Sequence, residues 1–155
     1  MGEIIYRKAT IDDWDAAMSL AWKTFLRFEA PEYTQEGVEN FQNFISDDTL
    51  RKMFVNDSYQ MYIAMDGERL VGMITLRDMY HISLLFVDEE YHKQGIGSKL
   101  IMCMGQYVKS YVGRSIMTVN AAPYAEGFYH RIGFIYRGLR TVRDGITYTP
   151  MELLL

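Results

Sequence analysis

The fold is decided by residues 87–100, Val87-Asp88-Glu89-Glu90-Tyr91-His92-Lys93-Gln94-Gly95-Ile96-Gly97-Ser98-Lys99-Leu100. The stretch that leads into it, 81–87 (His-Ile-Ser-Leu-Leu-Phe-Val), is nearly all apolar, which is typical of a central strand covered on both faces. The stretch that follows, 98–111, carries apolar residues at helical spacing. We therefore predict a buried strand, a loop with two glycines and a helix in direct succession.

Such a loop is suited to binding an anion. The first N–H groups of a helix have no partner within the helix and carry a partial positive charge, and glycine lets the backbone approach a ligand closely. Lys93 and Lys99 add positive charge, so the pattern favours a phosphate ligand. The Walker spacing is absent, and the dinucleotide fingerprint fails because its third glycine position is Leu100. The alternative is that Gly95 and Gly97 only turn the chain.

The rest of the chain alternates between strand and helix patterns around this segment. Asp66-Gly67 and Asp144-Gly145 are hairpin signals. We predict strands at 3–9, 59–65, 70–76, 81–87, 116–119, 134–139 and 147–153, and helices at 11–27, 34–45, 48–54, 98–111 and 122–132. This order predicts a mixed α/β fold with one central mixed sheet flanked by helices, in a single domain over 1–155. The middle portion predicts a local parallel pairing.

Composition narrows the class of protein. The chain has 155 residues, of which 49% are hydrophobic and 23% charged, with a net charge of −4, so a nucleic-acid partner is not favoured. Cys103 is the single cysteine, which excludes a disulfide within the chain and a cysteine-based zinc site. We expect no metal. The sequence has neither a signal-peptide pattern nor a run of about 18 apolar residues, so we expect a cytoplasmic protein without membrane association.

Two separate blocks of the sequence carry a recognisable pair of motifs. The first is His92-Lys93-Gln94-Gly95-Ile96-Gly97. The second is Val119-Asn120 followed by Ala125 and by 128–134, Phe-Tyr-His-Arg-Ile-Gly-Phe. Together they resemble the GNAT superfamily of N-acetyltransferases, although the family has Gln or Arg at the first position of the first block and this chain has His. The resemblance covers essentially the whole chain.

The resemblance implies that acetyl-CoA binds as cosubstrate in a cleft between two splayed parallel strands, 81–87 and 116–119. Backbone N–H groups of 94–98 would hold its pyrophosphate, and Asn120 would hydrogen bond to the pantetheine arm or order a water. The Val87 N–H would stabilise the oxyanion that develops on attack. The cofactor-binding residues expected from the resemblance are Leu85, Phe86, Val87, His92, Lys93, Gln94, Gly95, Ile96, Gly97, Ser98, Asn120 and Tyr129.

The resemblance also implies two catalytic residues. Tyr129 is the expected general acid for the departing thiolate; the alternative is that its ring only packs on the helix face. His81 is the first candidate for the base that deprotonates the acceptor amine. Its rivals are Asp78, Glu29 and Glu32, or a chain of waters. The carboxylates of 29–33 lie where the family builds its acceptor wall, which would favour a cationic amine such as a polyamine or a basic peptide. The alternative is that 29–33 is a solvated acidic loop.

The expected function is therefore acetyl transfer to a primary amine of a small molecule or peptide, by direct attack in a ternary complex. Two alternatives stay open: a non-catalytic acyl-CoA sensor, and a toxin-type acetyltransferase acting on aminoacyl-tRNA through a basic C-terminal patch. The sequence does not identify the acceptor. The apolar end 151–155 is either a core strand or the interface of a homodimer.

Overall fold

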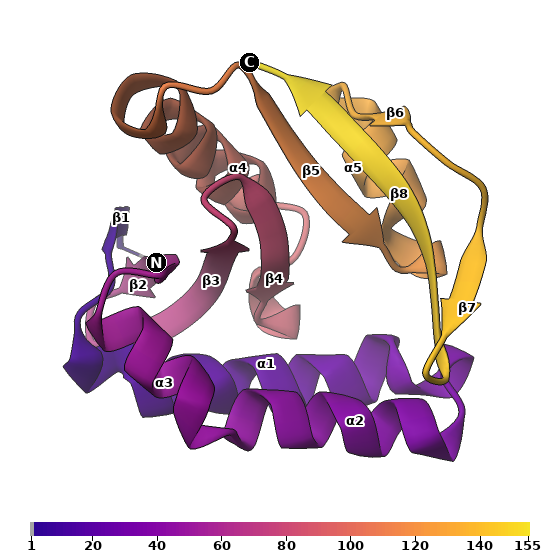
Figure 1. Ribbon diagram of the computed structural model, residues 1–155. Coiled ribbons are helices and arrows are strands. Elements are labelled where there is room, and N and C mark those ends of the chain that lie inside the picture. The colour runs from indigo at the N-terminus through magenta and orange to yellow at the C-terminus, as the bar shows by residue number, and fades with distance from the viewer. Residues whose placement is uncertain (1) are drawn as a thin grey trace.

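A computed structural model describes residues 2–155 and contains one eight-stranded sheet (Figure 1). The strand order is β1-β2-β3-β4-β5-β8-β6, and β7 pairs with β8. The strands are β1 (Ile4–Lys8), β2 (Tyr59–Asp66), β3 (Arg69–Arg77), β4 (His81–Val87), β5 (Ile116–Ala121), β6 (Ile135–Tyr136), β7 (Thr141–Arg143) and β8 (Ile146–Leu154). The predicted mixed α/β class is confirmed.

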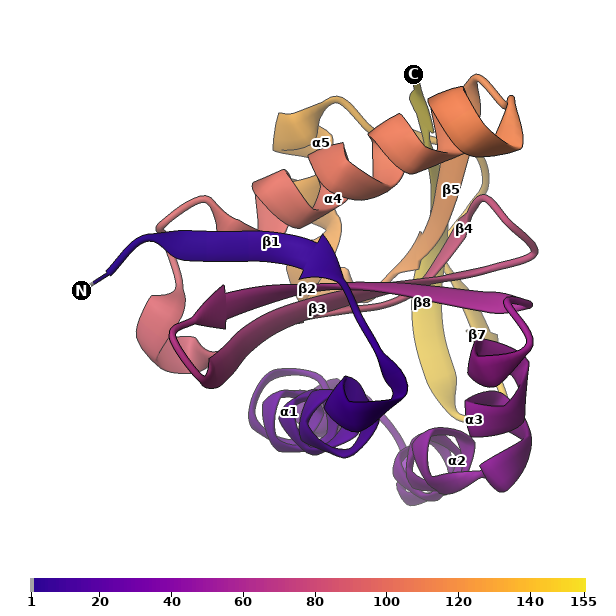
Figure 2. The same ribbon diagram turned by 90° about the vertical axis from the view of Figure 1, so that its left-hand side faces the viewer.

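Helices cover both faces of this sheet. The α-helices are α1 (Trp14–Phe28), α2 (Gln35–Ser46), α3 (Asp48–Val55), α4 (Ile96–Tyr107) and α5 (Glu126–Ile132). Figure 2 shows α1, α2 and α3 on one face and α4 and α5 on the other. Among residues 2–155, no helix combines the length and the apolar character needed to cross a bilayer.

Each helical layer buries its own apolar core against the sheet. On one face, α1 and α2 contribute Phe25 and Phe41, whose ring centroids lie 3.9 Å apart. On the other face, Leu100 and Met104 of α4 are fully buried. Strand β3 lies between the two cores, and its residues from Val71 to Leu76 are therefore buried. A strand covered on both faces is expected to be mostly apolar, as this one is.

The centre of the sheet is split. Strands β4 and β5 are parallel, as predicted, but they pair only at His81↔Thr118 and Ile82↔Val119. Beyond Ile82, β4 keeps β3 as its neighbour on one side and has no strand on the other. The sheet therefore presents an unpaired strand edge in its middle rather than at its border.

Several predicted boundaries were wrong. Helix α4 begins at Ile96 rather than at residue 98, because Gly95 caps it with a left-handed φ of 78°. It gives way at Val108 to a turn of π-helix, while the predicted helix 122–132 opens with a 3-10 turn before α5. The predicted strand 134–139 shrinks to β6, and β7 was missed. Both strands are short and exposed, so neither carries an apolar pattern.

Candidate functional site

The open edge of β4 points its backbone groups into the gap. The Asp88 N–H donates to Val71 O on β3 at 2.8 Å. Because hydrogen bonding alternates along an antiparallel pair, the N–H and C=O groups of Val87 and Leu85 face away from β3. These two residues therefore offer a ready-made strand edge to an extended ligand.

A cavity of about 470 Å³ lies along this edge, and it is called the cofactor cavity below. The strand and the glycine loop supply most of its wall. Its lining residues are Thr24, Leu85, Phe86, Val87, Tyr91, His92, Lys93, Gly95, Ile96, Gly97, Ser98, Tyr124, Ala125, Phe128, Tyr129 and Arg131. Ten of the twelve predicted cofactor-binding residues are among them.

The glycine loop is held in a defined shape. Lys93 and Gly95 both adopt left-handed conformations, with φ of 65° and 78°. The His92 Nε2–H donates to Val87 O at 2.8 Å, which ties the loop to the end of β4. The first intrahelical bond of α4 runs from Lys99 N to Gly95 O, so the preceding N–H groups have no partner within the helix. They remain available to an anion.

Gly97 is needed for space rather than for backbone conformation. A Cβ built on it would lie 2.9 Å from Phe128 Cζ, on the wall of the cofactor cavity. At Gly95, by contrast, a Cβ would meet nothing, and the positive φ explains the glycine. The two glycines of the loop therefore serve different purposes.

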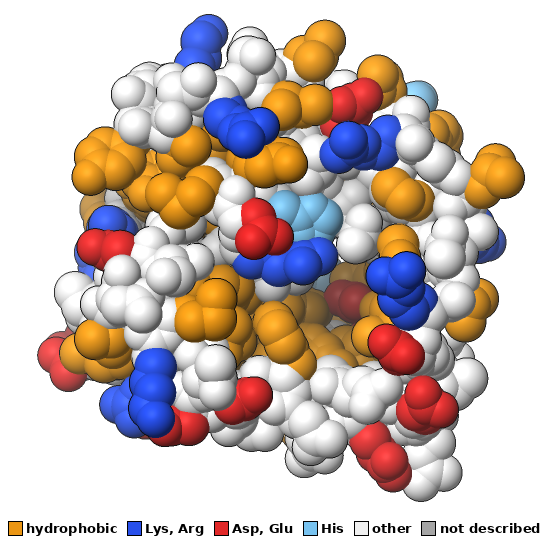
Figure 3. Space-filling view, in the orientation of Figure 1, with side chains coloured by type: hydrophobic (Ala, Val, Ile, Leu, Met, Phe, Trp, Pro, Cys, Tyr) orange, Lys and Arg blue, Asp and Glu red, His pale blue; other side chains and the backbone are white. Residues whose placement is uncertain are grey.

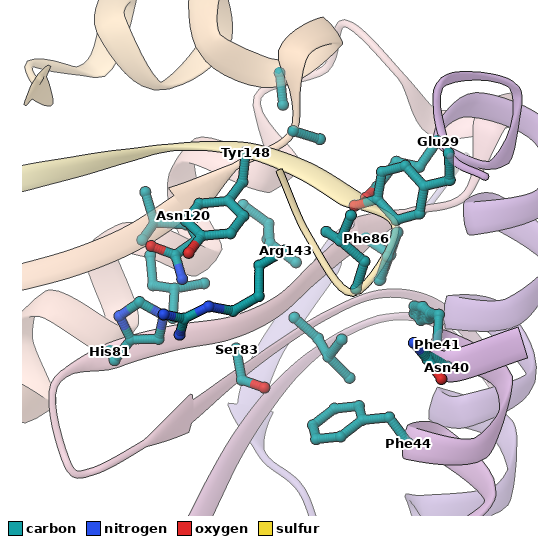
Figure 4. A pocket seen from close by; sticks show the side chains of 18 of the residues that line it. Glu29, Asn40, Phe41, Phe44, His81, Ser83, Phe86, Asn120, Arg143 and Tyr148 are labelled. Atoms are coloured by element: carbon teal, nitrogen blue, oxygen red, sulfur yellow. The ribbon is translucent and has the colours of Figure 1, made fainter. Parts of the chain in front are cut away.

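A second cavity, of about 720 Å³, lies on the other side of the β4 edge and is called the acceptor cavity below. Figure 3 shows this face hollowed, with basic side chains and a histidine at the mouth and an acidic side chain recessed inside. The wall includes Glu29, Tyr33, Glu36, Asn40, Phe41, Phe44, Arg77, His81, Ser83, Asn120, Tyr124, Tyr129, Arg143, Asp144 and Tyr148. Figure 4 shows the side chains of 18 of the residues that line it, ten of them labelled.

The two cavities meet at one junction. Leu85, Phe86, Tyr124, Ala125 and Tyr129 line both of them. Tyr129 is buried, and this burial, together with the nearby Glu29 and Tyr124, raises the pKa of its phenol well above the usual value. The phenol therefore remains protonated at neutral pH and can donate a hydrogen bond at this junction.

Glu29 is a carboxylate whose charge raises the pKa of Tyr129 at the junction. It ends α1, lines the acceptor cavity and accepts a hydrogen bond of 3.2 Å from the Tyr33 hydroxyl. Burial raises the pKa of its carboxyl from 4.5 to about 7, although the Tyr33 hydrogen bond opposes that rise. A carboxyl with this pKa is matched to proton transfer near neutral pH.

His81 also lines the acceptor cavity, but it is tied to the sheet. Its Nδ1 shares a hydrogen bond of 2.7 Å with Thr118 Oγ1. Burial, reinforced by the positive charges of Arg77 and Arg137, lowers the pKa of the imidazole to about 4. His81 is therefore neutral at physiological pH and a weak base.

The acceptor cavity is bridged by the turn between β7 and β8, which docks on the start of α2. Thr34 donates to Gly145 O from both its N–H (3.3 Å) and its Oγ1 (3.4 Å). Asn40 Nδ2 donates to Asp144 O at 3.0 Å. Gly37 and Gly145 face each other so closely that a Cβ on either would overlap the other residue's backbone. This contact, called the clasp below, joins segments more than 100 residues apart.

Two predicted cofactor residues lie elsewhere. Gln94 is exposed and lines neither cavity, and Asn120 lines the acceptor cavity only. Sequence reasoning missed Tyr124 and Arg131 as lining residues. An alanine-rich helix start gave no signal for Tyr124. Arg131 was noticed only as part of a basic patch, although α5 directs it at the cofactor cavity.

Other groups lie away from the site. Cys103 lines neither cavity; burial raises the pKa of its thiol, and Lys99 opposes that rise. Within residues 2–155, the structure has no group of three or more His, Cys, Asp or Glu side chains arranged to hold a metal ion.

Comparison with known proteins places this geometry in context. The family model of the acetyltransferase (GNAT) domain matches residues 29–155. The uncharacterized N-acetyltransferase YafP of Escherichia coli K12 is 36% identical over 75 residues, which are 48% of this chain and 45% of that protein. The match thus spans about half the length of that relative.

Solved structures share the whole fold. A GCN5-related N-acetyltransferase from Rhodopseudomonas palustris has a TM-score of 0.84 at 21% identity, covering 100% of this chain and 98% of its own. The PaiA N-acetyltransferase of Thermoplasma acidophilum, solved in complex with coenzyme A, has a TM-score of 0.83 at 20% identity, covering 99% and 100%. At these identities the likeness is one of fold.

Proposed function

The chain belongs to the GNAT acetyltransferase family, as its sequence resemblance predicted, and we propose that it transfers the acetyl group of acetyl-CoA directly to a primary amine. The observation that carries the proposal is the meeting of two cavities at an unpaired strand edge. A donor and an acceptor bound in the two cavities would face each other at Leu85, Phe86 and Tyr129. Such proximity turns an encounter of two molecules into a unimolecular step.

The residues of the cofactor cavity fit acetyl-CoA. The free N–H groups at the start of α4 suit a pyrophosphate, with Lys93 and Arg131 as added positive charge. The N–H and C=O groups of Leu85 and the N–H of Val87 face the gap and suit the amides of an extended pantetheine arm, whereas Val87 O is already bound by His92. Bound there, acetyl-CoA supplies an activated acyl group.

Two donors would stabilise the charge that develops during transfer. The Val87 N–H faces the gap and is placed to donate to the acyl oxygen, a contribution typically worth about 3 kcal/mol of barrier. The protonated Tyr129 phenol at the junction is placed to donate to the departing sulfur. We propose both roles on geometry and protonation state.

We propose Glu29, rather than the first-ranked His81, as the base that accepts the proton of the acceptor ammonium. The pKa of Glu29 is about 7, whereas that of His81 is about 4 and one of its ring nitrogens is engaged by Thr118. Glu29 is also close enough to Tyr129 to raise the pKa of that phenol. Proximity to the junction and a suitable pKa both support Glu29.

The test is thiol release from acetyl-CoA against a panel of amines, comparing the native protein with Tyr129→Phe. We expect kcat to fall at least about tenfold in the variant while the affinity for acetyl-CoA is kept, because only the hydroxyl is removed. Tyr136→Phe, which removes an exposed hydroxyl that donates to Glu126, is the matched control.

The possible results of this assay distinguish the role of Tyr129 from the proposed function as a whole. Unchanged turnover in Tyr129→Phe would refute the role of the phenol but not acetyl transfer. Acetyl-CoA binding without turnover of any amine would favour a non-catalytic sensor. Absence of acetyl-CoA binding would refute the proposed function altogether.

A further inference from the structure

The acceptor cavity carries opposite charges at its two ends. Glu29 lies at the junction with Tyr129, and Arg77 and Arg143 lie by His81. In Figure 4, Glu29 is at one side of the view, whereas the Arg143 guanidinium reaches toward His81 at the other. The pair Arg77 and Arg143, with the neighbouring His81, is called the basic end below.

The basic end lacks an internal partner for its charge. No carboxylate of residues 2–155 forms an ion pair with Arg143, whereas Arg140 on the same segment is paired with Glu126 at 2.8 Å. Arg77 has only Asp78, at 3.9 Å, and both side chains of that pair are about half exposed or more. Such a surface pair neutralises little charge. An arginine turned into a cavity without a partner is suited to receiving an anion from a ligand.

The charges that act on His81 include more than one arginine. Burial is the main cause of the lowered pKa of its imidazole, Arg77 and Arg137 lower that pKa further, and Asp78 opposes them. Thr118 occupies one ring nitrogen of His81. An anion bound here would therefore meet guanidinium groups and a neutral ring, with no need for proton uptake.

The cavity also contains Glu36 and Asp144, so its mouth is not uniformly basic. In the clasp, Asn40 binds the backbone carbonyl of Asp144 and so fixes the turn. Arg143 is the residue immediately before Asp144. The clasp thus holds one arginine over the cavity. The acidic groups near the mouth suit additional polar or cationic substituents, but they leave the two arginines unneutralised.

Resting on the proposed function, we infer that the acceptor is zwitterionic: it carries its reactive amine at the Glu29 end and an anionic group, a carboxylate or a phosphate, at the basic end. The ammonium would then be paired with the partly buried Glu29, and the anion with the two arginines that line the cavity from its exposed end. The requirement excludes simple alkylamines and diamines as good acceptors, because neither satisfies the arginines. Small amino acids and aminoalkyl phosphates satisfy both ends.

The experiment measures kcat/KM for a set of ω-amino acids of increasing chain length, each with its matched alkylamine and diamine, and for aminoethyl phosphate. Because the amino acid adds a charge-assisted hydrogen bond to the arginines, we expect the kcat/KM of the best amino acid to exceed that of its alkylamine by at least about tenfold. Amino acids against aminoethyl phosphate decide between carboxylate and phosphate. Calorimetry of the same compounds on the CoA-loaded protein provides a readout that does not need turnover.

Variants assign the preference to the basic end. Arg143→Ala should reduce kcat/KM for the zwitterion by about tenfold and that for the alkylamine much less. Arg143→Glu should reverse the preference toward the diamine. Arg51→Ala is the control, because Arg51 lies on α3 and does not line this cavity.

The inference is overturned if the zwitterion neither binds nor reacts better than its alkylamine and diamine, or if its advantage survives in Arg143→Ala. If either result is obtained while acetyl-CoA still binds, the zwitterionic acceptor is refuted and the proposal of acetyl transfer is not. Failure of acetyl-CoA binding refutes the proposed function itself.

Discussion

Replacement of Glu29 by Gln should abolish most of the activity and, at the same time, stabilise the protein at alkaline pH. The native structure raises the pKa of this carboxyl from 4.5 to about 7, mainly by burial. Below 4.5 the group is neutral whether the chain is folded or unfolded. As pH rises from 4.5 to about 7, the unfolded chain loses the proton and the folded one keeps it, so stability falls over this window and stays lower above it.

The size of the effect follows from the same two values. The interval from 4.5 to about 7 corresponds to about 3 kcal/mol, at about 1.4 kcal/mol per pH unit. Gln has nearly the same shape and cannot ionise. The difference in the free energy of unfolding between Glu29→Gln and the native protein should therefore be about 3 kcal/mol larger near pH 8 than near pH 4, in the direction of a more stable variant.

Activity should change in the opposite direction. For the native protein, kcat/KM should rise as pH increases through about 7, because the base must be ionised. In Glu29→Gln, kcat/KM at neutral pH should fall by about 10²–10⁴-fold, and the remaining pH dependence should follow the free fraction of the amine alone. The defect should shrink at alkaline pH, where more amine arrives deprotonated.

Denaturant unfolding and steady-state kinetics over the same pH range provide the assay. Glu32→Gln is the matched control: Glu32 lies three residues on and accepts a hydrogen bond from Tyr124 N, which an amide can also accept. Because Glu32 helps to raise the pKa of Glu29, the control should keep the rise in kcat/KM and move it slightly to lower pH. A stability difference that is independent of pH, or a Glu29→Gln enzyme that keeps the native profile, would refute the reasoning.

Two further predictions concern glycines. Gly97→Ala should weaken acetyl-CoA affinity about tenfold with the fold kept, because overpacking against Phe128 costs about 1–3 kcal/mol at the cofactor cavity. Gly95→Ala should instead lower the free energy of unfolding by about 1–2 kcal/mol, since the φ of Gly95 is positive. Acetyl-CoA affinity and the free energy of unfolding should be measured for both variants. A loss of affinity alone in Gly95→Ala, or a loss of stability alone in Gly97→Ala, would contradict these assignments. Gly37→Ala should raise KM for the acceptor and leave acetyl-CoA affinity unchanged, because its Cβ would push Gly145 away and open the clasp. An unaltered acceptor KM would contradict that role.

The central elements of the fold could be predicted because their sequence signals are strong. The strand 81–87 was predicted with the same bounds as the structure has, since its apolar run is framed by polar residues. The parallel pairing of β4 with β5 was predicted from the order of elements, but the separation of the two strands beyond Ile82 was expected only from the family resemblance. No local pattern shows where two strands part.

The candidate site was less predictable, for a physical reason. A carboxylate in the loop 29–33 reads as a solvated surface group, and only the packing of Tyr33 and Tyr124 near Glu29 reveals its altered pKa. His81 has a suitable pKa as a free imidazole, but burial and the neighbouring arginines remove that advantage. Titration depends on tertiary surroundings, which spacing along the chain does not specify.

The clasp has a consequence for which molecules can enter. It consists of hydrogen bonds on the exposed surface, so separating its two sides requires far less free energy than unfolding either core. A bulky acceptor, such as the end of a peptide, would need the turn to part from α2 before it could enter from the side. For such an acceptor, the rate of entry would depend on the stability of the clasp and not only on the volume of the cavity.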